Sequence, residues 1–439
     1  MMAFEKLLKL SQDLLDKGNL EMEEETVPEK SWGSQGKIYL NGCLQFLEEF
    51  KEHGAELNPP PVQTLLVLGG LCGNTLTTGA LRITENLHEV ATRVLEVVVR
   101  NCGVDGVRKL LLLKPNNLSQ PNSPTLAIQF LRLCVARIAR SSGDGPDDSL
   151  NKCPVFRDAL VWLTGELGYP ELADEEFIGV LQPLGLRLTR DYRPQLQLAG
   201  FRVIRHLATK ARVADWRQSN RAEAVISQVF DHRVASTPGS SEAVLDEMYA
   251  TLMDLIQLLE PSKKQFWYDK IADQLLFDFS MESRKIRQTV LVRHLDRIMD
   301  VMKSSFVGHT RRFLHLVELI LLGPRTPSYL KESLPNEALD STVRLAMLQC
   351  VEKFLQLAWP LVCSTLLPAL VPPLIAFVDL EHTAASQADD HNSSLDERIS
   401  EKLSSIFRRI IELQPRALQE IFIPASATVP SLSIYLPAR

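Results

Sequence analysis

The sequence predicts an all-α protein, an α-solenoid built from stacked antiparallel helix pairs. Apolar residues recur at helical spacing along most of the chain, and no stretch alternates apolar and polar residues for long enough to predict a strand. Pairs of such helices recur about every forty residues. Two helices with one apolar stripe each cannot bury both stripes alone, so repeated pairs must stack on one another.

The organisation changes along the chain. We expect an N-terminal helical region with irregular helices over 1–140, then a linker rich in Gly and Asp over 141–154. A regular repeat array over 155–425 and a C-terminal tail over 426–439 are predicted to follow. The spacing fits HEAT and armadillo repeats better than the roughly 33 to 34 residues of ankyrin and tetratricopeptide repeats. The predicted helix pairs cover residues 155–190, 191–235, 240–280, 284–325, 336–378 and 394–423.

The pair at 191–235 is the clearest of these. Pro194 suits the first position of a helix, where its missing N–H has no intrahelical partner anyway. Capping boxes, in which Ser or Asn precedes Glu or Gln by three residues, mark other helix starts. They occur at Asn220 and Glu223, Ser262 and Gln265, and Ser394 and Glu397.

The apolar positions of this pair are spaced three and four residues apart and predict a buried core. A later dipeptide, Trp359-Pro360, is typical of a helix end followed by the first residue of the next helix, with the indole closing the corner. The predicted core residues are Leu196, Gly200, Val203, Leu207, Val225, Val229 and Trp359.

Composition argues against several classes of function. The chain has 439 residues, with 48 Lys and Arg against 54 Asp and Glu, and a net charge of −6. A mildly acidic chain is not expected to bind nucleic acid or anionic membranes in general, because phosphate binding needs basic surface. The seven cysteines include no CxxC pair, which favours buried thiols in a reducing compartment. We expect a cytoplasmic location, with the nucleus left open.

One apolar stretch, 361–378, lies in an uncharged run long enough to span a membrane. Pro360, Pro368, Pro372 and Pro373 lie in the same run, and proline is costly inside a helix. We therefore interpret the stretch as a buried solenoid helix with a proline-broken turn.

No motif of a familiar catalytic or cofactor site is present. His88-Glu89 begins like a zinc-protease motif, but Thr92 stands where the second histidine should be. The glycines between Gly69 and Gly73 lack the Lys and Ser or Thr of a phosphate-binding loop. We therefore predict that the protein is not an enzyme and has no cofactor, catalytic residue or metal site. The alternative, an enzyme with an unrecognised site, would need convergent polar residues in a pocket.

Residues 187–233 carry ten basic and four acidic side chains, a net charge of +6 in a chain of −6. This basic segment is either a solvated outer face or a docking surface for an acidic partner segment. Trp216 is either a packing plug or an exposed anchor, whereas His206 is expected to be a hydrogen-bonded structural imidazole. The candidate partner surface consists of Arg193, Arg202, Arg205, Arg212, Trp216, Arg217 and Arg221.

A set of residues in the array resembles a known family in its order and spacing. The residues are Asp191-Tyr192, Gly200, His206-Leu207, Asn220-Arg221-Ala222, Val225, Arg293-His294-Leu295 and Trp359-Pro360. Together they resemble the Tti-two subunits of the Triple T complex, which joins Tel-two, Tti-one and Tti-two. The resemblance covers about residues 155–378.

The resemblance implies a non-enzymatic co-chaperone scaffold of the HEAT type. Its implied partners are the Tti-one and Tel-two subunits and the ninety-kilodalton heat-shock chaperone with its AAA+ ATPase co-chaperone. The implied clients are phosphatidylinositol-kinase-related protein kinases such as mTOR, ATM and ATR, which would place the protein in TOR signalling and the DNA damage response.

Another HEAT-type adaptor, such as a transport receptor or a phosphatase scaffold, is the alternative. A transport receptor is expected to repeat Trp and Asn at matching positions, and the five tryptophans of this chain show no such array.

Overall fold

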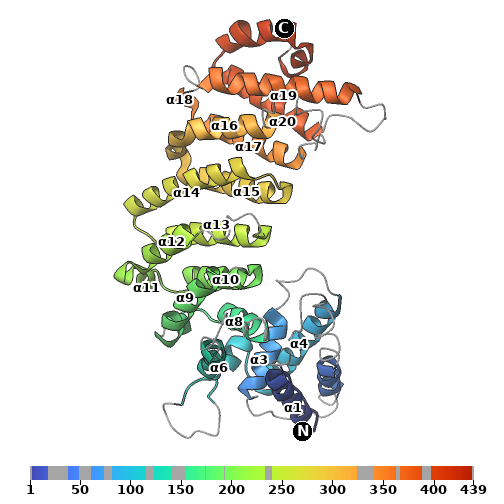
Figure 1. The fold of residues 1–439 in the computed structure, drawn as a ribbon, viewed down its shortest axis with the longest axis vertical. Helices are drawn as coiled ribbons and strands as arrows, with labels where there is room; N and C mark the ends of the chain where they lie inside the picture. The colour runs from blue at the N-terminus through green and yellow to red at the C-terminus, as the bar shows by residue number, and fades with distance from the viewer. Residues whose placement is uncertain are drawn as a thin grey trace. The chain divides into compact units, whose positions relative to one another are not determined.

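The computed structural model describes residues 2–17, 38–48, 61–73, 82–114, 123–140, 154–173, 175–191, 193–232, 240–323, 341–361, 366–387 and 397–437. Within these ranges the regular structure is helical and no strand occurs, so the predicted all-α class is confirmed. The chain divides into two compact units, Met1–Val234 and Ala235–Arg439. In each unit, helices that lie near one another in sequence, often alternate ones, pack together (Figure 1).

The first unit is organised around a helix that is apolar on all sides, α3 (Val62–Gly73). Nearly all of its residues are buried, so it must be covered from several directions. The helices that pack against it are α1 (Met2–Lys17), α4 (Arg82–Asn101), α6 (Leu126–Arg140) and α8 (Pro154–Glu166). Residues 38–48 form a further helix, and the short α5 (Val107–Leu111) lies between α4 and α6 in sequence.

The same unit continues into helix pairs. α9 (Glu175–Thr189) packs on α10 (Pro194–Lys210) and on α12 (Arg221–His232), while α10 also packs on α8. The short α11 (Val213–Arg217) and a 3-10 turn (Gln218–Asn220) connect α10 to α12.

Glycines permit the two tightest helix contacts of this unit. A methyl group at Gly69 of α3 would collide with the Trp162 ring of α8, and one at Gly73 would collide with the carbonyl oxygen of Asp158. The stretch between Gly69 and Gly73 therefore acts as a flat contact face, where the backbone of α3 approaches α8 closely.

The crossing of α9 and α10 is built in the same way. A methyl group at Gly200 would come within 2.6 Å of the Gly185 carbonyl oxygen and 2.7 Å of the Thr189 backbone nitrogen. A methyl group at Gly185 would lie 2.9 Å from Ile204. Backbone atoms cannot move aside as side chains do, so only glycine fits at Gly200.

The second unit consists of two layers of helices. The first layer contains α13 (Glu242–Ile256), α15 (Lys285–Met302), α17 (Ser341–Leu357) and α20 (Glu397–Leu413), each packed on the next (Figure 1). The second layer contains α14 (Pro261–Met281), α16 (Thr310–Leu322) and α19 (Leu367–Gln387), packed in the same sequential manner. Alternate helices therefore stack on their counterparts in the next pair, as expected for a solenoid.

Acid–base pairs connect successive helices of the first layer. Every step of the layer has at least one such link, and each link joins an acidic residue of one helix to a basic residue of the next. The links are Asp246 to His294, Asp296 to Lys353 and Glu352 to Lys402, at 2.7, 2.5 and 2.6 Å. We call these contacts the interhelix ladder.

The C-terminal residues close the second unit. A π-helical turn, η8 (Leu418–Phe422), leads into α21 (Ile423–Thr428) and a 3-10 helix, η9 (Pro430–Tyr435). The Phe407 ring of α20 lies 5.4 Å from Phe422 and 6.1 Å from Tyr435, measured between ring centroids. Residues 426–437, which we predicted as part of a tail, thus contain helical turns with buried side chains.

The predicted helix pairs correspond to α8 with α9, α10 with α12, α13 with α14, α15 with α16, α17 with α19, and α20 with the C-terminal turns. The first helices of these pairs begin at residues 154, 194, 242, 285, 341 and 397, so the interval widens from 40 to 56 residues. The predicted spacing of about forty residues therefore fits the first pairs and is too short for the last two. The linker predicted at 141–154 lies almost wholly outside the described residues, and the helices flanking it, α6 and α8, belong to one unit.

The capping boxes have mixed outcomes. Asn220 directly precedes α12. The box at Ser262 is wrong, because Pro261 takes the first position of α14 and Glu260 is the N-cap residue. Ser394 lies outside the described residues. Ser241 caps α13 instead, accepting a hydrogen bond from the Val244 backbone N–H at 3.3 Å.

None of the described helices is long and apolar enough to cross a membrane. The cysteines that the structure describes are free thiols, and burial raises the pKa of Cys43 to about 12 and that of Cys72 to about 11. Such thiols stay protonated at neutral pH and react slowly.

We predict that Gly200→Ala destabilises the first unit by about 1–3 kcal/mol, because the added methyl group meets backbone atoms of α9. Gly179→Ala is the matched control: Gly179 is exposed in α9, nothing lies within 4 Å of an added methyl group, and the change should stabilise by roughly 0.5–1 kcal/mol. Denaturant unfolding of both variants measures the difference. Equal effects at the two positions would contradict the close crossing.

Candidate interaction surfaces

The predicted core of the central pair is buried. Leu196, Val203, Leu207, Val225 and Val229 are each at most 4% exposed. The prediction for Trp359 is wrong, because its side chain is 60% exposed. After α17, the chain buries Ala358 at the corner and turns Trp359 outward at the start of the short α18 (Trp359–Leu361).

Arg193, predicted for the partner surface, is buried and has a structural role. Its guanidinium donates to both carboxylate oxygens of Asp191, at 2.8 and 2.7 Å, and its backbone N–H donates to the same carboxylate. Desolvation acts to raise the pKa of Asp191, but the contacts with Arg193 outweigh it and lower that pKa overall. The ion pair fixes the turn that precedes α10, and Arg193 is not available to a partner.

Trp216 is a packing plug and not an exposed anchor. Its side chain is 0% exposed, and its indole N–H donates to the backbone carbonyl oxygen of Leu207 at 3.0 Å. That carbonyl lies in the last turn of α10 and also accepts a hydrogen bond from the Ala211 backbone N–H at 3.0 Å, so the indole bonds to its second lone pair. The ring can be buried because this carbonyl satisfies its only polar atom, so the assignment of Trp216 to the partner surface is wrong.

Arg202 is half-buried and lies near the Asp158 carboxylate of α8. Asp158 is almost fully buried, and its closest cation is Arg157, at 2.8 Å. Desolvation raises the pKa of Asp158, while the charges of Arg157 and Arg202 oppose the rise. Arg202 therefore supplies part of the positive charge that a buried carboxylate needs.

Arg212 lies in a mixed polar and aromatic patch. Its guanidinium pairs with Asp215 at 2.9 Å and lies 5.2 Å from the centroid of the Tyr169 ring, which is about half exposed. Arg108, which lies in α5, donates a hydrogen bond to the Tyr169 carbonyl oxygen at 2.7 Å and forms an ion pair with Glu171. Sequence reasoning missed Arg108 and Tyr169, because Tyr169 contacts Arg108 and Arg212 only in the folded unit.

The remaining basic residues of the predicted surface are accessible. Arg217 is exposed, and Arg205 and Arg221 are partly exposed. Together with Arg212 they form what is left of the candidate basic surface in the first unit. The seven residues predicted for the partner surface therefore do not form one exposed surface, because Arg193 and Trp216 are buried.

His206 is a structural imidazole within the same unit. Its Nε2 lies 2.8 Å from the backbone carbonyl oxygen of Leu167, so the Nε2–H tautomer donates a hydrogen bond there. Desolvation lowers the pKa of His206, the charge of Lys210 adds to this effect, and the bond to Leu167 opposes it. His206 thus holds α10 against the turn that follows α8.

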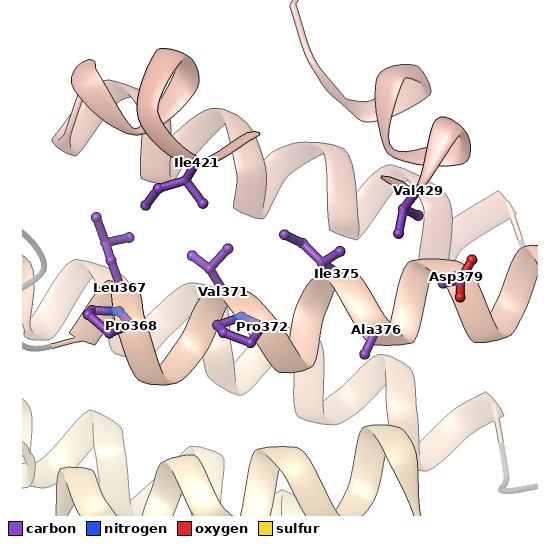
Figure 2. Close-up of a pocket in the computed structure, with 9 residues that line it drawn as sticks. All are labelled: Leu367, Pro368, Val371, Pro372, Ile375, Ala376, Asp379, Ile421 and Val429. Atoms are coloured by element: carbon purple, nitrogen blue, oxygen red, sulfur yellow. The ribbon is translucent and has the colours of Figure 1, made fainter. Parts of the chain in front are cut away.

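The second unit contains an open apolar groove of about 470 Å³ that the sequence did not indicate. One wall is formed by η8, α21 and η9, from Leu418 to Tyr435, which we call the C-terminal closure; it contributes Ile421 and Val429. The other wall is α19 (Figure 2). The α19 wall consists of Leu367, Pro368, Val371, Pro372, Ile375, Ala376 and Asp379. Asp379 is the one charged side chain among the groove-lining residues, so the groove offers binding surface and no convergent acid, base or nucleophile.

Within the described ranges, no three His, Cys, Asp or Glu side chains gather in a way that would hold a metal ion. His88, which begins the partial zinc-protease motif, accepts at its backbone carbonyl a hydrogen bond from the Thr92 hydroxyl at 2.9 Å, an ordinary helical contact.

Comparison with known proteins gives one named relative. No model of a protein family matches the chain. The chain is similar to TELO2-interacting protein 2 of Mus musculus, with 23% identity over 223 residues. The match covers 48% of this chain and 40% of the mouse protein, so it spans well under half the length of that relative. The relative belongs to the family that the sequence resembles, which confirms the resemblance.

Among solved structures, the crystal structure of Kap121p matches with 14% identity and a TM-score of 0.33. The match covers 94% of this chain and 51% of that chain. At that TM-score it adds nothing to the fold assignment, which rests on the helices and their contacts.

We predict that His206 makes the stability of the first unit depend on pH. Its folded pKa lies below the ordinary value of 6.5, so the unfolded chain binds the proton more tightly. The contribution of neutral His206 to the unfolding free energy is therefore fully present above about pH 6.5. This contribution is lost as the pH falls through the unfolded pKa toward the folded one.

His206→Gln keeps an N–H donor for Leu167 and removes the titration. The difference in unfolding free energy between wild type and this variant, followed from pH 7.5 to 5, should shift against the wild type as the pH falls. A difference that stays constant over this range would contradict the assigned neutral state of His206.

Proposed function

We propose that the chain is a non-enzymatic scaffold subunit of a Triple T-type co-chaperone complex. The similarity to TELO2-interacting protein 2 carries this proposal, because that protein's name describes an interaction partner and not a catalyst. The helical layers support it, since stacked helix pairs present extended surfaces suited to binding other proteins.

The proposed partners are the Tti-one and Tel-two subunits. Through them the chain would work with the ninety-kilodalton heat-shock chaperone and its AAA+ ATPase co-chaperone on kinases of the mTOR, ATM and ATR class. We further propose that it acts in the cytoplasm, and that it has no catalytic activity and no cofactor of its own.

Rapid, induced degradation of this chain in cells tests the proposal. Because subunits of an obligate complex lose stability without their partner, Tti-one and Tel-two should fall first and the client kinases later. Unchanged levels of all these proteins after complete loss of the chain would exclude the proposed function and favour another type of adaptor.

A point substitution in the core should reproduce this loss. Val229 is 4% exposed in α12, so Val229→Asp buries a carboxylate in an apolar core. The cost is several kcal/mol, which is large beside the ~5–15 kcal/mol by which a folded domain is stable. We predict a large drop in the abundance of the chain, followed by Tti-one, Tel-two and the kinases, in quantitative immunoblots.

Arg212→Glu is the control for this experiment. It reverses a charge on an exposed side chain that pairs with Asp215 three residues along the chain, away from the apolar core, so folding and abundance should change much less than with Val229→Asp. Normal levels of the chain with Val229→Asp would contradict the core assignment. Low levels of the chain with normal Tti-one and Tel-two would contradict the proposed complex.

A further inference from the structure

The groove between α19 and the C-terminal closure extends along about three turns of helix. Its α19 wall presents side chains at four-residue intervals from Leu367 to Asp379, which is about three turns or roughly 18 Å of helix. A second row, containing Pro368, Pro372 and Ala376, runs beside the first. Two parallel rows with this spacing form a channel into which the i, i+4 ridge of another helix can pack.

The opposite wall is held in place by contacts of its own. Phe422, next to the groove residue Ile421, is fully buried against Phe407 of α20. Tyr435 of η9 lies 3.1 Å from the His382 ring of α19, between Oη and Nε2. The groove is therefore formed before any partner arrives, which lowers the entropic cost of binding.

Charge indicates the kind of occupant. Asp379 lies at one end of the groove, beneath Val429 in Figure 2, and the rest of the lining is apolar. Its side chain is exposed and has no hydrogen-bond or ion-pair partner among the described residues. A carboxylate in this place attracts a Lys or Arg and repels a fatty acid or an anionic lipid headgroup.

We propose that this groove binds an amphipathic helix of a partner protein, about three turns long, with apolar residues at i, i+4 spacing and a Lys or Arg that pairs with Asp379. Helix-in-groove binding is a common mode of peptide recognition. The inference rests on the proposed scaffold role, in which the chain binds other proteins, and it does not depend on which partner supplies the helix.

A photo-crosslinking residue in place of Ala376 identifies the occupant. The full chain is expressed in cells with benzoylphenylalanine at this exposed groove position, or at Met281 of α14 as a control that is 72% exposed outside the groove. We expect an Ala376-specific crosslink to one amphipathic segment of a partner, with a Lys or Arg within one turn of it. Crosslinks to lipid, to a second copy of this chain, or to nothing would overturn the inference.

Affinity measurements test the geometry with the identified partner. Ala376→Arg places a long cationic side chain at the edge of the groove and should weaken binding at least tenfold, whereas Ala427→Arg, exposed in α21 outside the groove, should change it less than twofold. Thermal midpoints check that each variant is folded. Equal affinities for the two variants would overturn the inference.

A charge exchange gives a second test that needs no change in the groove's apolar residues. Asp379→Lys should weaken binding several-fold, and reversal of the partner's basic residue to Glu should restore it. Additive losses without restoration would refute the pairing.

These outcomes separate the groove from the proposed complex. If the wild-type chain purifies with Tti-one and Tel-two and Ala376→Arg does not alter this or any other helix binding, only the groove inference fails. If a crosslinked helix belongs to an unrelated protein and the chain binds neither subunit, only the proposed complex fails.

Discussion

Each helix described in this protein buries its apolar stripe only against neighbouring helices of its stack, and the rest of the structure depends on that constraint. Where the helices are most apolar, as in α3, they must be covered from several sides. Where they are amphipathic, as in α20, one face is buried and the other is left for solvent or partners. The stability of each unit is therefore distributed along the stack and not concentrated in one central core.

The two units meet the constraint differently. In the first unit, glycines bring helix backbones into direct contact, which fixes the α3–α8 and α9–α10 crossings by shape alone. In the second unit, the interhelix ladder joins successive helices through contacts between acidic and basic side chains. Its middle link shows the effect: desolvation lowers the pKa of Lys353, but Asp296 and Asp300 outweigh this and raise it overall, so the cation is favoured in the fold. Partly exposed pairs of this kind set register more than they add stability.

Periodicity was enough to predict the helix pairs from sequence, because a helix with a 3.6-residue apolar repeat shows that repeat wherever it packs. The orientation of single side chains was not predictable in the same way. Trp216 and Arg193 are polar-tipped residues in the short segments that flank α10, and their burial depends on hydrogen bonds to the Leu207 carbonyl and to the Asp191 carboxylate. Trp359 failed in the opposite direction, because the smaller Ala358 fills the corner. The groove was not predictable from sequence, because its two walls are separated by more than forty residues of the chain.

The central claim is that the chain acts as a binding subunit whose function is carried by partners. Native mass spectrometry of the endogenous protein, purified through a tag under mild conditions, tests it most directly. The account predicts a stoichiometric assembly that contains Tti-one and Tel-two together with this chain. Recovery of the chain alone, or in a stable assembly that lacks both subunits, would contradict it.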